Sequence, residues 1–155
     1  MLQKVLIANR GEIALRITRA CKTLGIKTVG IYSDADKDLM HLRFVDEAVC
    51  IGPGASSESY LNIPAIITAA EISGADAIHP GYGFLSERAE FAQAVIDAGL
   101  KWIGPSPSAI ENLGDKIAAR KIAASVGAPL VQGTQDPLKH ADEALDFAKQ
   151  YGLPI

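Results

Sequence analysis

The sequence is poor in cysteine and aromatic residues, and it has no long apolar run. Two cysteines, Cys21 and Cys50, occur in 155 residues, and aromatic side chains make up 6%. Disulfide frameworks and zinc sites need more cysteines at closer spacing, so we expect two reduced, buried thiols. No apolar stretch approaches the roughly 18 residues of a membrane span, and the N-terminus lacks the features of a signal peptide. We therefore expect a cytoplasmic protein with no membrane partner.

Basic residues are not in excess either. Lysine and arginine number 15 against 18 acidic residues, which gives a formal charge of −3. No positive excess favours a nucleic-acid partner, and none is expected. Apolar residues make up 48% of the chain and charged residues 21%, an ordinary composition for a globular domain with a hydrophobic core.

Short apolar runs alternate with helical patterns along most of the chain. The runs predict strands, and their continuous apolar character is typical of parallel sheets. Strands are expected at 4–8, 28–32, 47–51, 75–78 and 100–103. Helices are expected at about 13–24, 62–74, 84–96, 108–111, 115–126 and 139–151. This order predicts an α/β fold, a Rossmann-like open and mainly parallel sheet with helices on both faces.

The pattern changes after Gly127. Residues 128–138 contain two prolines and polar turn clusters, so we expect one domain over 1–127 and a linker leading into a further region over 128–155. The last residues, 153–155, begin an apolar segment like the start of a strand. This ending predicts that the chain is a piece of a larger protein.

Two strand ends lack the residues of familiar ligand sites. After the first strand, Asn9-Arg10-Gly11 replaces the glycine-rich turn that brings backbone close to a pyrophosphate, so we expect a tight turn held by Asn9 instead of an NAD site. The acidic run 34–38 has Leu39 and Val45 where a calcium loop needs glycine and glutamate. We expect that run to be a solvated turn.

The fourth strand leads into His79-Pro80-Gly81-Tyr82-Gly83-Phe84. Two glycines around Tyr82 allow a sharp turn that presents its ring and hydroxyl. The amide groups of a nearby helix would point at the same space. The residues alone leave two alternatives open, a ligand site at Tyr82 or a structural turn with Phe84 in the core. His79 is expected to be a buried, hydrogen-bonded histidine.

Another candidate lies at Gly114-Asp115-Lys116. Asp115 can cap a helix, which places Lys116 at the positive end of the helix dipole, where a lysine costs stability unless an anion binds. The glycine spacing of a P-loop is absent, so a solvated lysine remains the alternative. No Ser-His-Asp, Cys-His or His-Glu-x-x-His pattern is present, and no catalytic residue is assigned.

Several long motifs resemble the opening of biotin carboxylases. They are VLIANRGEIALRITRA at 5–20, SYLNIPAII at 59–67, AIHPGYGFLSE at 77–87, WIGPS at 102–106 and GDK at 114–116. The resemblance covers nearly the whole chain, in the family's order, and is closest to the biotin carboxylase subunits of bacterial acetyl-CoA carboxylases. It implies that 1–127 is the N-terminal Rossmann-like domain and that 128–155 leads into an ATP-grasp fold, cut short.

The resemblance also implies an activity for the larger protein. Biotin carboxylases are ligases in which ATP and bicarbonate form carboxyphosphate, whose CO2 is then attached to biotin on a carrier protein, and Mg2+ or Mn2+ stabilises the phosphates. In acetyl-CoA carboxylase this is the first step of fatty acid synthesis. Biotin-dependent carboxylases of pyruvate, propionyl-CoA and related substrates share these motifs, so the sequence leaves the final acceptor open. The implied partners are the biotin carboxyl carrier protein, carboxyltransferase subunits and a second copy of the enzyme.

The resemblance assigns roles to six residues of this chain. It implies that Lys116 contacts ATP, that Tyr82 and Gly83 line the cleft near biotin, and that Arg16, Arg19 and Thr23 form a dimer face, for which a solvated helix face is the alternative. Catalytic and metal-binding residues are expected after residue 155, so the fragment alone is expected to be inactive. Other ATP-grasp ligases, such as those of carbamoyl-phosphate or purine synthesis, lack the ANRGEIA and HPGYGFLSE pair. A stand-alone binding module would require a reading frame that ends at Ile155.

Overall fold

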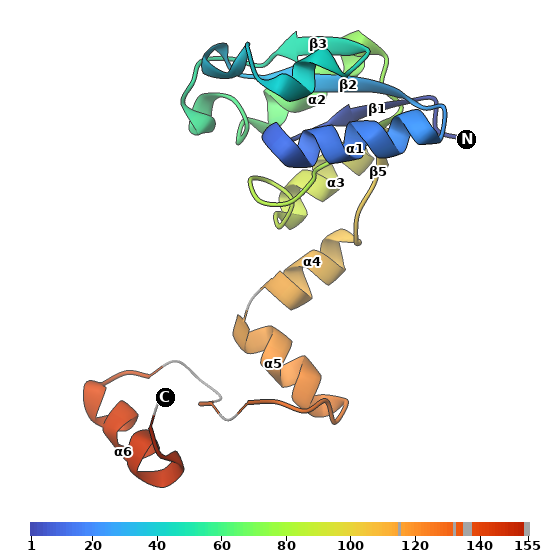
Figure 1. Cartoon of the computed structure of the whole chain (residues 1–155). Coiled ribbons are helices and arrows are strands. Elements are labelled where there is room, and N and C mark those ends of the chain that lie inside the picture. The colour runs from blue at the N-terminus through green and yellow to red at the C-terminus, as the bar shows by residue number, and fades with distance from the viewer. Residues whose placement is uncertain (115, 132, 135–137, 154–155) are drawn as a thin grey trace. The chain divides into compact units, whose positions relative to one another are not determined.

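The structure is a computed structural model that describes residues 1–114, 116–131, 133–134 and 138–153. The chain divides into two compact units, Met1–Ile110 and Glu111–Ile155. Figure 1 follows both units along the chain. In the described ranges, no helix is long and apolar enough to cross a membrane.

A five-stranded sheet forms the centre of the first unit. Its strands are β1 (Lys4–Ile7), β2 (Lys27–Tyr32), β3 (Glu47–Cys50), β4 (Ala77–His79) and β5 (Lys101–Trp102). They lie in the order β3-β2-β1-β4-β5, and every neighbouring pair is parallel. From β1 the chain therefore adds β2 and β3 toward one edge of the sheet, and then β4 and β5 on the other side of β1. Such a reversal opens a crevice at the carboxyl ends of the two central strands, where ligands of this fold class bind.

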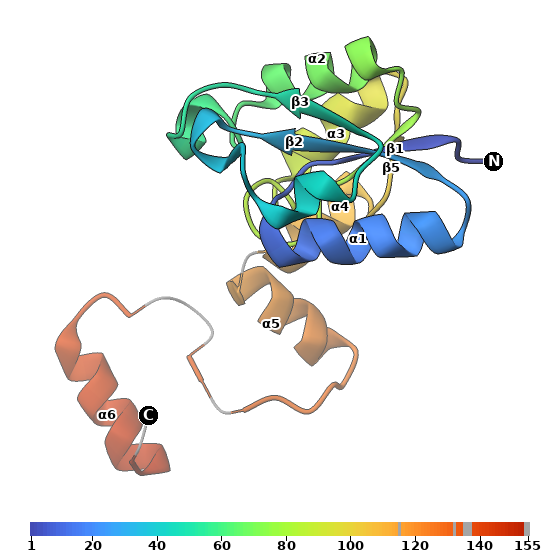
Figure 2. The ribbon, with the colours of Figure 1, turned by 45° about the horizontal axis from the view of Figure 1, so that its top comes forward.

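Helices cover both faces of this sheet, as Figure 2 shows. Helix α1 (Gly11–Thr23) lies on one face, and α2 (Ile63–Ser73) and α3 (Ala89–Asp97) lie on the other. Side chains of a strand point alternately to its two faces, so Val5 and Ile7 pack in the core under α1, while Leu6 packs in the core under α2 and α3. The predicted Rossmann-like α/β fold is confirmed.

Short helical turns fill the loops, and caps set the helix ends. The 3-10 turns are η1 (Asp34–Asp36), η2 (Met40–Arg43) and η3 (Ser56–Glu58). Asn62, the first residue of the helix predicted at 62–74, caps α2, since its Oδ1 accepts a hydrogen bond from the Ala65 amide at 3.1 Å. Gly74 ends α2 in the left-handed conformation that glycine adopts easily.

Three helices continue the chain after β5. They are α4 (Pro107–Gly114), α5 (Lys116–Ser125) and α6 (Ala141–Tyr151). The last two match the helices predicted at 115–126 and 139–151, and α6 ends at Gly152 as expected. Residues 154–155, part of the predicted apolar segment at the end of the chain, lie outside the described residues. Asp115, the predicted cap of α5, also lies outside them.

The prediction of two buried thiols is correct for Cys21 and wrong for Cys50. Cys21 is buried, and Cys50 is exposed at the end of β3. Because β3 is an edge strand with one face toward the core, Val49 packs inward and Cys50 points to solvent. The Cys50 thiol donates to a carboxylate oxygen of Asp34 at 3.3 Å.

Two predicted helix starts are also wrong. The helix expected from Phe84 begins at Ala89, and Phe84 lies in the preceding turn with a φ of 48°. Ile96, near the end of that helix, is 44% exposed. The helix expected at 108–111 begins at Pro107, and Ser106 caps it, since its hydroxyl accepts from the Ala109 amide at 3.2 Å. The apolar spacing at 84–96 resembles a helix because Phe84 does reach the core, from a turn.

Asp76 fastens the start of β1. Its carboxylate oxygens accept hydrogen bonds from the backbone amides of Gln3 at 2.9 Å and Lys4 at 3.1 Å. Partial burial raises the pKa of Asp76, but these hydrogen bonds and the charge of Lys101 outweigh that effect and lower its pKa below the ordinary value. The ionised carboxylate therefore stabilises the folded state.

Replacing Asp76 with asparagine is expected to lower the unfolding free energy by about 1–2 kcal/mol at pH 7. The contribution is complete above the unfolded-state pKa of about 4 and is lost as the pH falls through the lower folded-state value. The difference between D76N and wild type should therefore shrink between pH 4 and pH 2. Urea unfolding of this chain at several pH values measures it, with the exposed Asp38→Asn as the control. A difference that is constant down to pH 2 would contradict the assignment.

Candidate functional site

An open pocket lies at the carboxyl ends of β1 and β4, where the strand order reverses. Two loops that are distant in sequence line it. The lining residues are Asn9, Arg10, Gly11, Glu12, Ile13, Tyr82, Gly83 and Phe84. The turn after the first strand and the glycine-flanked tyrosine turn, predicted as separate features, thus form one site.

The side chain of Asn9 joins the two loops. Asn9 is buried, and its Oδ1 accepts from the Arg10 amide at 2.9 Å, which confirms the predicted turn. Its Nδ2 donates to the carbonyl oxygens of Pro80 and Tyr82, each at 2.8 Å. One amide group therefore closes its own turn and fixes the backbone on both sides of Gly81.

Gly81 permits this close approach. Its φ is 68°, a conformation that other residues rarely adopt, and a Cβ at this position would lie 2.8 Å from Asn9 Nδ2. Gly83 has a similar φ of 70°, but nothing lies within 4 Å of the position of a Cβ there. The two glycines around Tyr82 therefore have different roles, because only Gly81 is required for contact between the loops.

Tyr82 projects into solvent between these glycines. It is 61% exposed, and its hydroxyl donates to the carboxylate of Glu12 in the first turn of α1. The amides at the pocket belong to α1, which begins at Gly11, and not to the helix after Tyr82, which begins only at Ala89. His79 Nδ1 accepts from the Gly81 amide at 3.0 Å, and burial lowers the pKa of His79, so its ring is a neutral acceptor. The pocket thus offers a ring face, a carboxylate and the positive end of α1.

Asp36 is buried beside the pocket, and the prediction of a solvated acidic turn is wrong for this residue. Its Oδ2 accepts from Arg10 Nη1 at 2.6 Å, from the Tyr60 hydroxyl at 2.8 Å and from the Ser33 hydroxyl at 3.0 Å. Burial raises the pKa of Asp36, but the three hydrogen bonds and the charge of Arg10 outweigh burial and lower it. Burial and the bond to Asp36 raise the pKa of Tyr60 to about 12, so its hydroxyl remains a donor.

Arg10 connects Asp36 with the aromatic residues at the pocket. Its guanidinium carbon lies 5.2 Å from the ring centre of Tyr60 and 5.6 Å from that of Phe84. The two rings stack on each other with centres 5.0 Å apart and planes 24° from parallel. The roles of Asp36, Tyr60 and Glu12 were not predicted from the sequence. The spacing of Ser33 and Asp36, three residues apart after a buried strand, is a pattern that could have indicated a local hydrogen bond.

The other predicted site residues are not among those that line this pocket. Arg16, Arg19 and Thr23 are exposed on α1, while Ile17 and Cys21 of the same helix are buried. Lys116 is the first residue of α5, and its side chain lies outside the described residues. Among the described residues, no group of three or more His, Cys, Asp or Glu could hold a metal ion.

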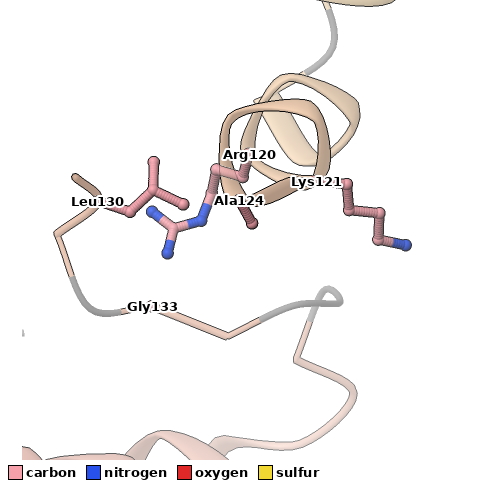
Figure 3. A pocket seen from close by; sticks show the side chains of 5 residues that line it. All are labelled: Arg120, Lys121, Ala124, Leu130 and Gly133. Carbon is pink, nitrogen blue, oxygen red and sulfur yellow. The ribbon is translucent and has the colours of Figure 1, made fainter. Parts of the chain in front are cut away.

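The second unit has a pocket of its own, which sequence analysis did not predict. Figure 3 shows its lining residues: Arg120, Lys121, Ala124, Leu130 and Gly133. Arg120 Nη2 donates to the carbonyl oxygen of Val131 at 2.9 Å, which ties α5 to the segment that follows it. This hydrogen bond gives the arginine a structural role.

Comparison with known proteins identifies relatives of the chain. The family model "Biotin carboxylase, N-terminal domain" matches residues 1–110. The biotin carboxylase of Pseudomonas aeruginosa is 55% identical over 156 residues, which cover 100% of this chain and 35% of that protein. Mitochondrial pyruvate carboxylase of Rattus norvegicus is 54% identical over 155 residues, which cover 99% of this chain and 13% of that protein.

The fold of the chain also matches solved structures. One is the biotin carboxylase domain dimer of Hydrogenobacter thermophilus 2-oxoglutarate carboxylase, in complex with MgADP, ADP and bicarbonate. The match has a TM-score of 0.89 and 45% identity, and it covers 99% of this chain and 34% of that one. The chain spans about a third or less of the length of these relatives. It belongs to the family of biotin carboxylase N-terminal domains.

Proposed function

We propose that this chain is the N-terminal part of a biotin carboxylase that uses ATP and bicarbonate to carboxylate biotin on a carrier protein. The observation that carries the proposal is the 55% identity, over the whole chain, with a biotin carboxylase. The 2-oxoglutarate carboxylase domain, which contains MgADP and bicarbonate, supports the same substrates. Residues of the ANRGEIA and HPGYGFLSE motifs line the same pocket, which supports a shared role for the two motifs in ligand binding.

In this proposal the pocket forms one wall of the biotin side of the cleft. Tyr82 offers a flat ring face to the ligand, and Gly83 leaves space beside it. The carboxylate of Glu12 accepts a hydrogen bond from the Tyr82 hydroxyl and so orients the ring. In this proposal Mg2+ or Mn2+ would stabilise the phosphates during carboxyphosphate formation, and no residue of this chain is assigned to hold the metal.

Lys116 is the proposed ATP contact. It begins α5, where the helix dipole adds to its positive charge and favours an anionic ligand. In the same proposal, residues 128–155 contain the start of an ATP-grasp region.

Two substitutions in the full-length enzyme test these assignments. Lys116→Ala is expected to raise the KM for ATP about tenfold, because a charged contact to phosphate is lost. Tyr82→Ala is expected to raise the KM for biotin several-fold and to leave the KM for ATP within about twofold. Steady-state kinetics with each substrate varied in turn measures both, and the exposed Lys37→Ala is the control. Unchanged biotin kinetics in Y82A would refute the placement of Tyr82 beside biotin.

The 155 residues alone are expected to be inactive. Biotin-dependent ATP hydrolysis by the isolated chain would refute that expectation.

The proposed final acceptor is acetyl-CoA, which would make the reaction the first step of fatty acid synthesis in the cytoplasm, with a carrier protein and carboxyltransferase subunits as partners. Pyruvate is the second candidate, because a pyruvate carboxylase is 54% identical over nearly the same span. An assay of the complete carboxylase with acetyl-CoA and with pyruvate distinguishes the two candidates.

The exposed face of α1 is the proposed dimer contact. Arg16 and Arg19 point away from the core, and the Thr23 hydroxyl donates to the Arg19 carbonyl at 3.0 Å. A related carboxylase domain was solved as a dimer, which supports this use. Arg19→Glu in the full-length enzyme is expected to weaken dimerisation at least about tenfold, since a reversed charge at an interface is repulsive. Sedimentation velocity measures the effect, with Lys37→Glu as the control, and an intact dimer in R19E would exclude this face.

A further inference from the structure

The buried carboxylate of Asp36 organises residues from three parts of the first unit. Arg10 follows β1, Ser33 follows β2, and Tyr60 precedes α2, and each donates to the same oxygen within 3.0 Å. The side chain of Asp36 is 11% exposed, whereas that of its ionic partner Arg10 is 42% exposed. The carboxylate is therefore the fixed member of the pair, and Arg10 is the member that could move into solvent.

Arg10 connects the Asp36 carboxylate with the ring of Phe84. Its guanidinium lies over both rings of the Tyr60–Phe84 stack, an arrangement that attracts a cation to the ring faces. Tyr60 is also held, because its hydroxyl donates to Asp36 and accepts from the Ser33 amide at 3.1 Å. Phe84 thus packs against two side chains that both depend on Asp36.

Phe84 needs such support because its backbone is strained. Among the described residues it is the only non-glycine residue with a positive φ, at 48°. For a bulky residue this backbone conformation is unfavourable in free energy. It persists only where the surrounding structure holds the residue in place. Phe84 follows Tyr82 by two residues, so whatever holds Phe84 also sets the turn that presents Tyr82.

We infer that Asp36 is a positioning residue for the biotin side of the pocket. It holds Arg10 and Tyr60 against Phe84, and Phe84 in turn fixes the conformation of the Tyr82 turn. The inference rests on the proposed role of Tyr82. Of the residues that line the pocket, Asp36 forms a side-chain hydrogen bond with Arg10, and neither of the two long pocket motifs contains Asp36.

The test replaces Asp36 with asparagine in the full-length enzyme and makes two measurements. Hydrogen exchange of the peptide over residues 80–88, followed by mass spectrometry, is expected to become about tenfold faster, because the loss of a charge-assisted bond frees Arg10. The KM for biotin is expected to rise about fivefold to tenfold, with the KM for ATP within twofold. The control is Asp38→Asn, an exposed carboxylate close by in sequence, which should change neither value.

The two measurements separate the possible failures. Unchanged exchange at residues 80–88 in D36N overturns the positioning role itself. Faster exchange with unchanged biotin kinetics instead overturns the proposed placement of Tyr82 beside biotin. If D36N does not fold, Tyr60→Phe gives the same readouts in milder form, because it removes only the hydroxyl and keeps the stacked ring.

A double-mutant cycle tests the path through Phe84. In a Phe84→Leu background the ring contact with Arg10 is already lost, so adding D36N is expected to change loop exchange less than twofold. The same tenfold effect in both backgrounds would show that Asp36 acts by general destabilisation, and would overturn the inference.

Discussion

Gly81→Ala in the full-length enzyme is expected to lower kcat/KM for biotin about 100-fold. A Cβ at Gly81 would lie 2.8 Å from Asn9 Nδ2 and 3.1 Å from Asn9 Cβ, and the φ of 68° is itself unfavourable for alanine. The side chain of Asn9 would have to leave, which breaks its bonds to the Pro80 and Tyr82 carbonyls. Two lost hydrogen bonds and the backbone strain together cost about 3 kcal/mol, which corresponds to this loss of efficiency.

Gly83→Ala is the matched control, on the other side of Tyr82. Its φ of 70° imposes similar strain, but no atom lies within 4 Å of the added methyl group. The expected loss is therefore about fivefold, from strain and from a methyl group in the space beside Tyr82, without loss of the Asn9 hydrogen bonds. Equal losses in G81A and G83A would show that strain dominates and that contact between the two loops is unimportant for biotin.

Phe91→Ala is expected to destabilise the first unit by about 3–5 kcal/mol. Phe91 is fully buried in α3 and meets Trp102 edge to face, with ring centres 5.4 Å apart and planes at 86°. Its removal leaves a cavity and exposes one side of the indole. Domains of this size have only about 5–15 kcal/mol of stability, so a substantial fraction of F91A could unfold in mild denaturant.

Urea unfolding followed by the fluorescence of the single tryptophan, Trp102, measures this loss directly at the contact. The control is Ile96→Ala in the same helix, where the side chain is 44% exposed and the expected change is within about 0.5–1 kcal/mol. Equal destabilisation by the two variants would mean that helix formation, and not core packing, determines stability here.

The fold could be predicted from sequence because it depends on local patterns. Continuous apolar runs such as 4–8 predict buried parallel strands, and Asn62 and Gly74 mark the ends of a helix by their own hydrogen bonds and backbone conformation. These patterns involve residues close together in the chain. The fold class and most elements were therefore correct to within a few residues.

The site was harder to predict because its contacts join distant residues. Asn9 meets Pro80 and Tyr82, and Arg10 meets Asp36 and Phe84, through pairings that exist only after the sheet has formed. Asp36 looked like a solvated acid because its neighbours in sequence are polar, and its burial depends on Arg10 and Tyr60. The two loops were identified separately, and the strand order that brings them together is a tertiary property.

The central position of β1 has a consequence for biosynthesis. This strand leaves the ribosome before the others, yet its partner β4 begins only at Ala77, after β2, β3 and α2 have been made. During that interval one edge of β1 has no partner, and an unpaired edge of apolar residues can join with another chain. The acceptors of the Asn9 side-chain amide, the carbonyl oxygens of Pro80 and Tyr82, are also synthesised only after β3 and α2. A chain that ends before residue 77 would thus contain three of the five strands, with one edge of β1 unpaired.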